Sequence, residues 1–357
     1  MNTQGGIEDN AAIIGKAQIA RHLFGSFDAM AIRCCVELGI ADIISNHNRP
    51  TTLSEIATGI NSPSVNVDGL ARLMRFLVHR KIFDEIPQSD DGKADTIYSL
   101  NHCSNWLVNH KNITMTPFVM LYTDPFMLSP LRDLSRSIKE GGTAFKMAHG
   151  DEIFDFSLIN SEFNKMFNEG MACLTKSTMD VIMLNYKNGF LGMKGSVVDV
   201  GGGTGVAISE IVKAYPHLKG INFDLPQVIS TAPTYDGVTH VAGDMFKAIP
   251  PAETIFIKYI LHNWSNDDCV KILKNCRKAI HVDTGKVIIV EIVQQPAQDD
   301  LVNDVHVSLD LVMSAYFSNG RERTEGEWKK LLGESGFYRY NIIYIHEIVS
   351  IIEAFLL

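Results

Sequence analysis

Ser-Val-Val-Asp-Val-Gly-Gly-Gly-Thr-Gly, residues 196–205, is the stretch of this 357-residue chain that decides its fold. A short β-branched run leads directly into glycines, as it does where a buried strand enters a tight turn of an α/β sheet. The glycines let a ligand approach the backbone closely, because no Cβ stands in the way. Since open α/β sheets bind ligands at the carboxyl ends of their strands, the stretch predicts a cofactor pocket in the second half of the chain.

Downstream of this turn, strand and helix patterns alternate. We expect strands over Val197–Val200, Gly220–Phe223, Val238–Ala242, Thr254–Tyr259 and Lys286–Ile292. Helices are expected between them, for example Val206–Tyr215 and Asp267–Ala279. This alternation is typical of a doubly wound parallel sheet with helices on both faces.

The first hundred residues have a different pattern, with apolar residues at helical spacing over Ala17–Phe27 and Ala31–Ile44. Thr52 and Glu55 have the spacing of a capping box, which predicts a helix start. Two short strands, 81–86 and 96–100, follow this helical region. Helices followed by a small hairpin suggest a winged-helix-like shape.

A polar turn, Ser89–Gly92, separates the two strands of this hairpin. Winged helices often read DNA, but residues 51–100 contain five basic and seven acidic side chains. A protein that reads a DNA groove is expected to be clearly basic. We therefore interpret the region as a helical packing or dimerisation module, and a regulatory binding protein stays the less favoured alternative.

Composition excludes several classes of partner. The net charge of −9 argues against nucleic acid and anionic membranes, and no apolar run reaches the roughly 18 residues that span a bilayer. The segment Met1–Asn10 is polar and unlike a secretion signal, which predicts a cytoplasmic protein. The six cysteines form no Cys-x-x-Cys pair, so we expect no metal site and no disulfide. The shift in pattern predicts two domains, residues 1–160 and 161–357.

The glycine turn distinguishes between two cofactors. The dinucleotide fingerprint needs a glycine at position 206, where this chain has Val206, and this weighs against a nicotinamide oxidoreductase. Asp224 follows the next strand at a distance that suits hydrogen bonds from ribose hydroxyls. Asp244 and Met245 follow the strand after that, where they suit an adenine amino group and the adenine ring. Together these residues favour an adenosine-bearing sulfonium cofactor.

These residues belong to a set of ordered motifs in which the chain resembles plant class I S-adenosylmethionine-dependent O-methyltransferases acting on small phenolic molecules. The motifs are residues 198–205, Asn222–Pro226, Gly243–Phe246, Ile260–Trp264 and Arg321–Thr324. The resemblance implies a Rossmann-like methyltransferase domain and an N-terminal, mainly helical, winged-helix-like dimerisation domain that forms a homodimer. It implies S-adenosyl-L-methionine as cofactor, S-adenosyl-L-homocysteine as product, and no metal.

The resemblance also implies roles for individual residues. It assigns His262 as the general base and Glu291 and Glu322 as the carboxylates that flank and hold it. The expected cofactor contacts are Gly201, Gly203, Asp224, Asp244, Met245 and Lys258. The expected substrate contacts are Phe167, Met171, Met313, Phe317 and Asn263.

The chemistry of the motif residues agrees with these roles. A phenol with a pKa of about 10 is a poor nucleophile at neutral pH, and a neutral imidazole can take its proton as the oxygen attacks. Glu291 ends an apolar strand, which is a costly position for a charge without a purpose. The chain departs from the family pattern at Asn263, where the family has Asp, and in the loop Ser318–Arg321.

The predicted function is therefore metal-independent methylation of a phenolic hydroxyl of a plant specialised metabolite. A benzylisoquinoline-type alkaloid is the preferred acceptor. A flavonoid or phenylpropanoid acceptor is the alternative, and a nicotinamide oxidoreductase or a regulatory binding protein is less favoured.

Overall fold

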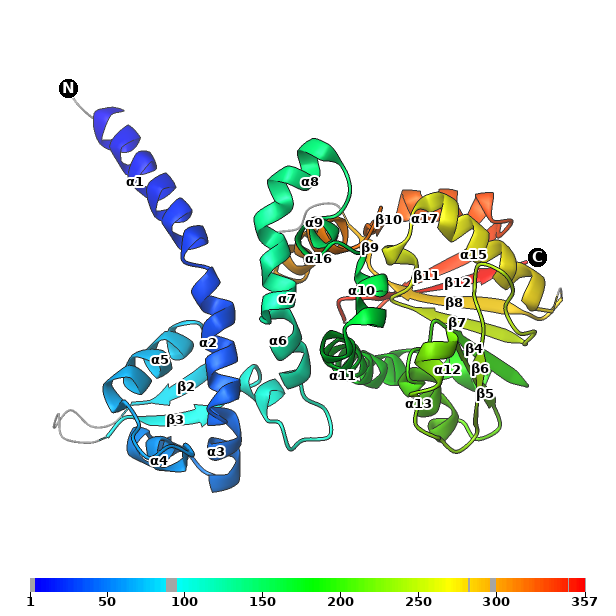
Figure 1. The fold of residues 1–357 in the computed structure, drawn as a ribbon. Coiled ribbons are helices and arrows are strands. Elements are labelled where there is room, and N and C mark those ends of the chain that lie inside the picture. Colours follow the sequence, from blue (N-terminus) through cyan, green and yellow to red (C-terminus); the bar gives the residue numbers. More distant parts are fainter. Residues whose placement is uncertain (1–3, 88–94, 282, 296–299, 346, 357) are drawn as a thin grey trace. The chain divides into compact units, whose positions relative to one another are not determined.

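The computed structural model describes residues 4–87, 95–281, 283–295, 300–345 and 347–356, so the turn predicted at Ser89–Gly92 lies outside the described residues. Contacts between residues divide the chain into two compact units, Met1–Asp124 and Pro125–Leu357 (Figure 1). No helix in the described parts of the chain is long and apolar enough to cross a bilayer.

The first unit consists of helices around a small antiparallel sheet of strand order β1-β3-β2. Its helices are α1 (Gln4–Leu23), α2 (Ser26–Glu37), α3 (Ile40–His47), α4 (Leu53–Gly59), α5 (Val67–His79), η1 (Ser104–Leu107) and α6 (Thr116–Tyr122). Its strands are β1 (Thr51–Thr52), β2 (Phe83–Ile86) and β3 (Ile97–Leu100).

Two details of the first unit test the sequence predictions. The capping box is confirmed, since the Thr52 side chain accepts from the Glu55 N–H and the Glu55 carboxylate accepts from the Thr52 N–H. The predicted helix Ala31–Ile44 is wrong as a single element, because Gly39 adopts a φ of +65° and separates α2 from α3. The predicted helix Ala17–Phe27 is likewise interrupted, at the junction between α1 and α2.

The second unit begins with helices. These are α7 (Pro125–Leu128), η2 (Ser129–Asp133), α8 (Leu134–Glu140), α9 (Ala144–His149), α10 (Ile153–Ile159), α11 (Ser161–Asn185) and α12 (Lys187–Leu191). Within this unit, Tyr316 Oη donates to Met127 O at 2.5 Å, and the rings of Phe145 and Tyr316 lie 6.1 Å apart. Residues 125–160 therefore pack with the second unit, and the compact units divide nearer the N-terminus than the predicted boundary at residue 160.

The seven-stranded sheet of the second unit has the order β11-β12-β8-β7-β4-β5-β6. Its strands are β4 (Ser196–Val200), β5 (Lys219–Asp224), β6 (Val238–Ala242), β7 (Thr254–Lys258), β8 (Lys286–Glu291), β11 (Arg339–Tyr344) and β12 (Ser350–Phe355). The five predicted parallel strands are confirmed to within a residue at each end. β11 and β12 were not predicted, and β12 runs antiparallel to both of its neighbours.

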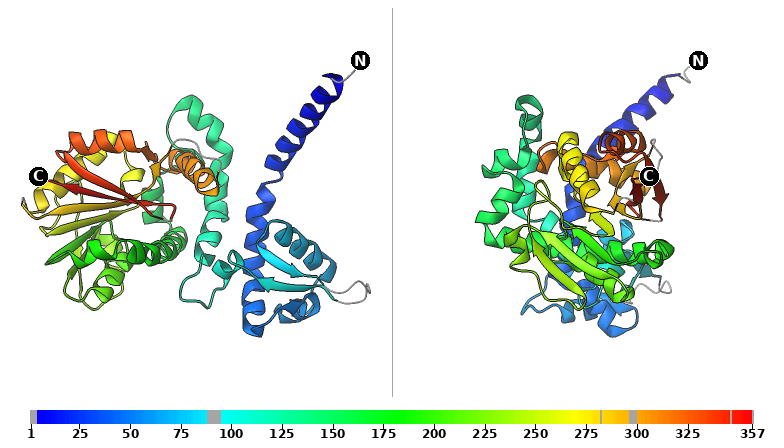
Figure 2. Two further views of the ribbon diagram at one scale, coloured as in Figure 1. Left: turned by 180° about the vertical axis from the view of Figure 1, so that it is seen from behind. Right: turned by 90° about the vertical axis from the view of Figure 1, so that its right-hand side faces the viewer.

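Helices cover both faces of this sheet (Figure 2). Val197 and Ile288 pack on one face with α11, α12 and α13 (Val206–Ala214). Val198 and Ile289 pack on the other face with α15 (Asn266–Ala279) and α17 (Glu325–Glu334). Both faces are therefore dry, which explains why the central strands read as continuous apolar runs.

Several short elements and one longer helix complete the unit. They are α14 (Pro226–Ile229), η3 (Leu261–Asn263), α16 (Leu301–Tyr316) and the parallel pair β9 (Val293–Gln294) and β10 (Arg323–Thr324). β4 lies between β5 and β7, so the strand order reverses there. In an open α/β sheet the ligand crevice lies at the carboxyl end of such a strand.

Candidate active site

The glycine turn after β4 has a backbone that only glycine adopts easily. Gly201 and Gly203 have φ values of +68° and +58°. A Cβ on Gly201 would lie 2.5 Å from Ile260 Cδ1, so the turn and the loop after β7 are in close contact. A Cβ on Gly203 would meet no atom within 4 Å, so this side of the turn is open. The turn combines a fixed backbone with space for a ligand.

Asp224, at the end of β5, is tied to the glycine turn. One carboxylate oxygen accepts from the Gly203 N–H at 2.8 Å, and the other accepts from the Leu225 N–H at 2.6 Å. Burial raises the pKa of Asp224, and these two backbone donors oppose the rise. Since a carboxylate oxygen has more than one acceptor position, both oxygens can still bind hydroxyl groups.

Asp244 and Met245 follow β6, next along the same edge of the sheet. Asp244 Oδ1 accepts from the Phe246 N–H at 2.9 Å, and Met245 packs against the core on the α15 face. Asn275, on α15, donates to the carbonyl oxygens of both Met245 and Phe246 at 3.0 Å. These contacts fix the backbone that presents the Asp244 carboxylate and the Met245 side chain.

Lys258, at the end of β7, donates to Thr175 Oγ1 on α11 at 2.9 Å. Burial lowers the pKa of Lys258, and the carboxylates of Asp199 and Glu291 oppose that effect. Burial also raises the pKa of Asp199, with Lys258 opposing. Asp199 Oδ2 and Asn222 Oδ1 are buried and have no hydrogen-bond partner among the described residues. Unsatisfied buried acceptors beside an open glycine turn fit a ligand that brings donors or positive charge.

His262 lies in the loop after β7, which we call the His262 turn (residues 259–264). Its Nδ1 is 2.8 Å from Glu322 Oε1 and 3.6 Å from Glu291 Oε2. The imidazole ring stacks on Tyr259, with ring centroids 5.6 Å apart. Because Nδ1 is engaged with a carboxylate, Nε2 is the nitrogen left to face a substrate.

Glu291 holds the backbone of the His262 turn as well as flanking the imidazole. Its Oε1 accepts from the N–H groups of Ile260, Leu261 and His262 at 2.9, 2.8 and 3.4 Å. The Glu291 carboxylate is fully buried, and burial raises its pKa while His262 opposes the rise. The two predicted carboxylates thus have different partners. Glu322 contacts the ring and Glu291 mainly binds the turn.

The pKa of His262 is raised above its ordinary value. Burial alone would lower this pKa, but the charges of Glu291 and Glu322 together outweigh the burial. One nitrogen of His262 and one carboxylate oxygen each of Glu291 and Glu322 lie within 4.8 Å of one another, a spacing that would also suit a metal ion. Hydrogen bonds to Nδ1 and to the turn account for one oxygen of each carboxylate, and the other oxygens, Glu291 Oε2 and Glu322 Oε2, are buried with no hydrogen-bond partner among the described residues.

Asn263, predicted to contact substrate, is buried in the His262 turn. Its Nδ2 donates to Tyr259 O at 3.2 Å, and its Oδ1 is buried with no partner in the described parts of the chain. Tyr259 itself has a φ of +54°, an uncommon value for a residue with a side chain. The Asn263 amide therefore closes a strained turn and leaves one acceptor unsatisfied.

The remaining predicted substrate residues lie on α11 and at the end of α16. Phe167 and Met171 are one turn apart on α11, and Met313 and Phe317 are both buried. Phe154 connects the two helices, because its ring centroid lies 6.5 Å from that of Phe167 and 5.5 Å from that of Phe317. The Phe154 ring also stacks on that of Trp264, the last residue of the His262 turn, with ring centroids 6.2 Å apart. The structure thus joins Phe167 and Phe317 through aromatic contacts that reach the His262 turn.

Several residues of this region were missed by the sequence predictions. Trp264 lies inside a quoted motif, and Asp199 could have been found by the argument used for Glu291, a charge in an apolar strand. Arg323 likewise lies inside a quoted motif, Arg321–Thr324, whereas Phe154 and Thr175 carry no such signal, because their neighbours in sequence are polar or at ordinary helical spacing.

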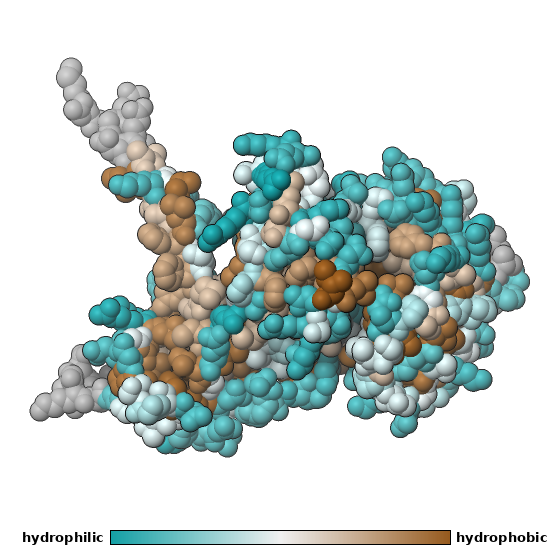
Figure 3. All heavy atoms as spheres, viewed as in Figure 1, coloured by the Kyte–Doolittle hydropathy of each residue, from teal (hydrophilic) through white to brown (hydrophobic). Residues whose placement is uncertain are grey.

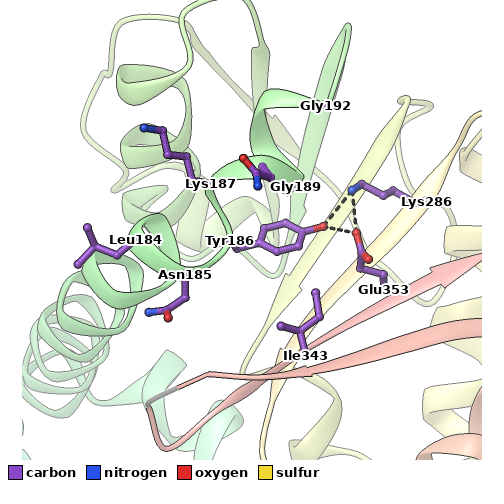
Figure 4. Close-up of a pocket in the computed structure, with 10 residues that line it drawn as sticks. Leu184, Asn185, Tyr186, Lys187, Gly189, Gly192, Lys286, Ile343 and Glu353 are labelled. Atoms are coloured by element: carbon purple, nitrogen blue, oxygen red, sulfur yellow. Dashed lines mark hydrogen bonds and ion pairs between the residues drawn. The ribbon is translucent and has the colours of Figure 1, made fainter.

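A separate hollow of about 680 Å³ lies away from all of these residues, between the end of α11 and the strands β8, β11 and β12 (Figure 4). Tyr186 donates to Glu353 there, and Lys286 Nζ donates to Tyr186 Oη at 2.9 Å and to Glu353 Oε1 at 3.0 Å (Figure 4). The three polar groups satisfy one another. We interpret the network as a structural tie between α11 and the sheet.

Comparison with known proteins gives two family matches. The model of the O-methyltransferase domain matches residues 131–338, and the model of the O-methyltransferase dimerisation domain matches residues 20–110. The chain is similar to (R,S)-reticuline 7-O-methyltransferase of Papaver somniferum, with 46% identity over 96% of this chain and 97% of the relative. It is equally similar to xanthohumol 4-O-methyltransferase of Humulus lupulus, with 46% identity over 98% of each chain.

Solved structures show the same fold. The methyltransferase CalO1 of calicheamicin biosynthesis, in its SAH-bound form, gives a TM-score of 0.80 at 22% identity and covers 99% of both chains. Human N-acetylserotonin methyltransferase in complex with SAM also gives a TM-score of 0.80, at 18% identity over 95% of this chain and 97% of that one.

Proposed function

We infer, since this chain belongs to the O-methyltransferase family, that it methylates a phenolic hydroxyl with His262 as the general base. The chain is an S-adenosylmethionine-dependent O-methyltransferase of plant specialised metabolism. Membership of this family favours such an enzyme over the nicotinamide oxidoreductase and the regulatory protein that the sequence left open. The enzyme is a homodimer, as the match to the O-methyltransferase dimerisation domain supports.

The residues at the carboxyl edge of the sheet fit the cofactor. Gly201 and Gly203 would admit it to the backbone, Asp224 would accept from its ribose, and Asp244 and Met245 would hold its adenine ring. Lys258 and the unsatisfied oxygen of Asp199 lie beside the same turn, where they suit its charged methionine end. The cofactor, when bound, supplies the activated methyl group.

His262 is suited to removing the proton of the acceptor. Glu322 accepts from Nδ1–H and so fixes the tautomer in which Nε2 has a lone pair. Once the phenol proton has moved to Nε2, two buried carboxylates beside Nδ1 stabilise the charge of the imidazolium. The single observation that carries the proposal is this buried hydrogen bond between His262 and Glu322, next to the open glycine turn. Catalysis would otherwise rest on positioning of the phenol.

A benzylisoquinoline-type alkaloid phenol is the acceptor that we propose, and a flavonoid or phenylpropanoid is the alternative. The two relatives reported above differ in this respect, since one is named for reticuline and the other for xanthohumol. The aromatic cluster of Phe154, Phe167, Trp264 and Phe317 suits a flat aromatic acceptor of either kind. We also propose that residues 161–357 carry the catalytic and cofactor residues, and that Phe154, from the part of the second unit that precedes them, completes the aromatic cluster.

The direct test is incubation of the protein with S-adenosylmethionine and a panel of both acceptor classes, with and without a chelator. We expect methylation of a phenol by either preparation. If folded, dimeric protein methylates no member of the panel, the proposed function is wrong. If the protein is active without the chelator and inactive with it, the mechanism needs a metal and the proposed role of His262 must be revised.

The base assignment has its own test. His262→Ala is expected to lower kcat by about 10²–10⁴-fold, because proton removal from the phenol is then uncatalysed. Binding of S-adenosyl-L-homocysteine, measured by calorimetry, should remain. His102→Ala, which alters an exposed histidine in the first unit, is the matched control and should leave kcat unchanged. Turnover of His262→Ala at the control's rate would contradict the assignment.

A further inference from the structure

Arg323, the first residue of β10, is an arginine that the structure buries completely. Its guanidinium has no carboxylate within ion-pair distance among the described residues. It binds backbone instead, since Nη1 donates to Leu261 O and Nη2 donates to Trp264 O, each at 2.9 Å. Nε donates to Asn266 Oδ1 at 3.0 Å. Burying a cation whose partners are neutral carbonyl groups costs free energy of desolvation. We therefore look for a role of Arg323 that a neutral residue could not fill.

The carbonyls that Arg323 binds belong to the residues on either side of His262 and Asn263. The same turn is held from other directions by Glu291, through three N–H groups, and by the Arg321 N–H, which donates to His262 O at 2.8 Å. Arg323 is the side chain that reaches both ends of the segment that carries the imidazole. Its planar fork holds two carbonyls through two separate nitrogens in a fixed geometry, whereas the donors of a lysine all converge on one nitrogen at the end of a flexible chain.

The charges around the imidazole also depend on Arg323. His262 faces Glu291 from β8, Glu322 from the residue before β10 and Arg323 from β10, and it stacks on the Tyr259 ring. With His262 neutral, two buried carboxylates are opposed by one guanidinium. With His262 protonated, the four charges sum to zero. Arg323 therefore limits how far the two carboxylates stabilise the imidazolium, so that His262 can still be neutral and accept a proton.

We propose that Arg323 is the positioning residue for His262, whose guanidinium holds the His262 turn and balances one of the two carboxylates beside the imidazole. Burial lowers the pKa of His262, the two carboxylates raise it, and Arg323 acts in the lowering direction. The proposal rests on the proposed function, because it assigns Arg323 to the base of that reaction. It places a determinant of the enzyme's pH range in a residue that need not touch substrate or cofactor.

Two substitutions separate the two parts of this role. Arg323→Gln removes the charge, and because the carboxylates are then unopposed, the pKa of His262 should rise. The acid limb of the kcat profile should move to higher pH, and kcat should fall by about 10-fold or more as the turn loosens. Arg323→Lys keeps the charge but loses the fork, so kcat should fall by about 10-fold while the limb stays in place. Arg136→Gln, which removes an exposed arginine from α8, is the matched control and should change neither.

An NMR titration of histidine-labelled, dimeric protein tests the charge effect without an acceptor. The His262 signal, assigned by its loss in His262→Ala, should titrate at higher pH in Arg323→Gln than in the unaltered protein. An unshifted titration would overturn the charge balance even if every assay of methylation failed, so this failure is distinct from failure of the proposed function. If Arg323→Gln does not fold, Arg323→Lys carries the test, and a kcat within twofold of the unaltered enzyme overturns the positioning role.

Discussion

At the scale of the residue, the site depends on where two carboxylates lie relative to one imidazole. Glu322 contacts Nδ1 of His262 directly, whereas Glu291 uses most of its hydrogen-bonding capacity on the backbone of the turn. The two side chains therefore have different functions although both are buried acids beside the same ring. Replacing one of them should not reproduce the effect of replacing the other.

The substitution Glu322→Gln tests this difference through pH. The amide removes a negative charge that raises the pKa of His262, so that pKa should fall and the acid limb of the kcat profile should move to lower pH. The maximal kcat should decrease by about 10- to 100-fold, since the imidazolium is less stabilised and the ring less firmly oriented. A pH–rate series with a saturating acceptor measures both effects. Glu334→Gln, an exposed change on α17, is the control, and a limb that moves to higher pH would contradict our interpretation.

At the scale of the element, the end of α11 is fixed to the sheet by the network of Tyr186, Lys286 and Glu353. Tyr186 is buried, and its ring also lies under the Lys286 ammonium at 5.3 Å. The network joins the C-terminal end of a helix that carries Phe167, Met171 and Thr175 to strands β8 and β12. It is therefore a structural support for the helix on one side of the proposed pocket.

Tyr186→Phe should destabilise the second unit. The change removes a donor to the Glu353 carboxylate, and a hydrogen bond to a charged group is worth about 1.5–3 kcal/mol. Urea denaturation followed by circular dichroism should show a fall of that size in the free energy of unfolding. Tyr338→Phe, at an exposed position, should change it by less than about 0.5 kcal/mol. Equal stability of the two variants would show that the network contributes nothing.

At the scale of the whole molecule, the first unit exposes a large apolar surface along α1 and α2, where brown side chains gather (Figure 3). Its most exposed members are Ile13, Ile19, Leu23, Phe24 and Phe27, each more than 60% exposed. Soluble monomers rarely leave such a continuous apolar face in water. This surface is where we expect the two copies of the homodimer to meet.

The double substitution Leu23→Asp and Phe27→Asp should weaken the dimer. Burial of a large apolar side chain stabilises by about 1.5–3 kcal/mol, and a two-fold interface loses each contact twice. We expect the dissociation constant, measured by analytical ultracentrifugation, to rise by at least about 10²-fold. Leu184→Asp, at an exposed leucine of α11, is the control. An unchanged dissociation constant in the double variant would place the interface elsewhere.

Much of this protein is determined by its sequence alone. The β-branched run into Gly201–Gly205 predicts β4, its turn and the sheet edge, because a buried strand and a tight glycine turn are local properties of a few consecutive residues. The periodicity of the following residues predicts four further strands for the same reason. The sequence did not predict the edge strand β11 or its neighbour β12, and Gly39 interrupts a helix whose apolar spacing is continuous. The motif residues His262, Glu291 and Glu322 were found by resemblance. Local patterns could not have grouped them, because Glu291 and Glu322 lie 29 and 60 residues beyond His262 in the sequence.

Only the tertiary structure decided which contacts each of these residues makes. It showed that Glu322 contacts the imidazole, that Glu291 binds the N–H groups of the His262 turn while Arg323 binds its carbonyl groups, and that Phe154 links α11 to α16. Hydrogen bonds and charge balance depend on distances of a few ångströms between segments that the chain brings together from β8, β10 and the loop after β7. No pattern within one segment contains that information, because the free energy of a buried charge is set by the neighbours that folding places around it.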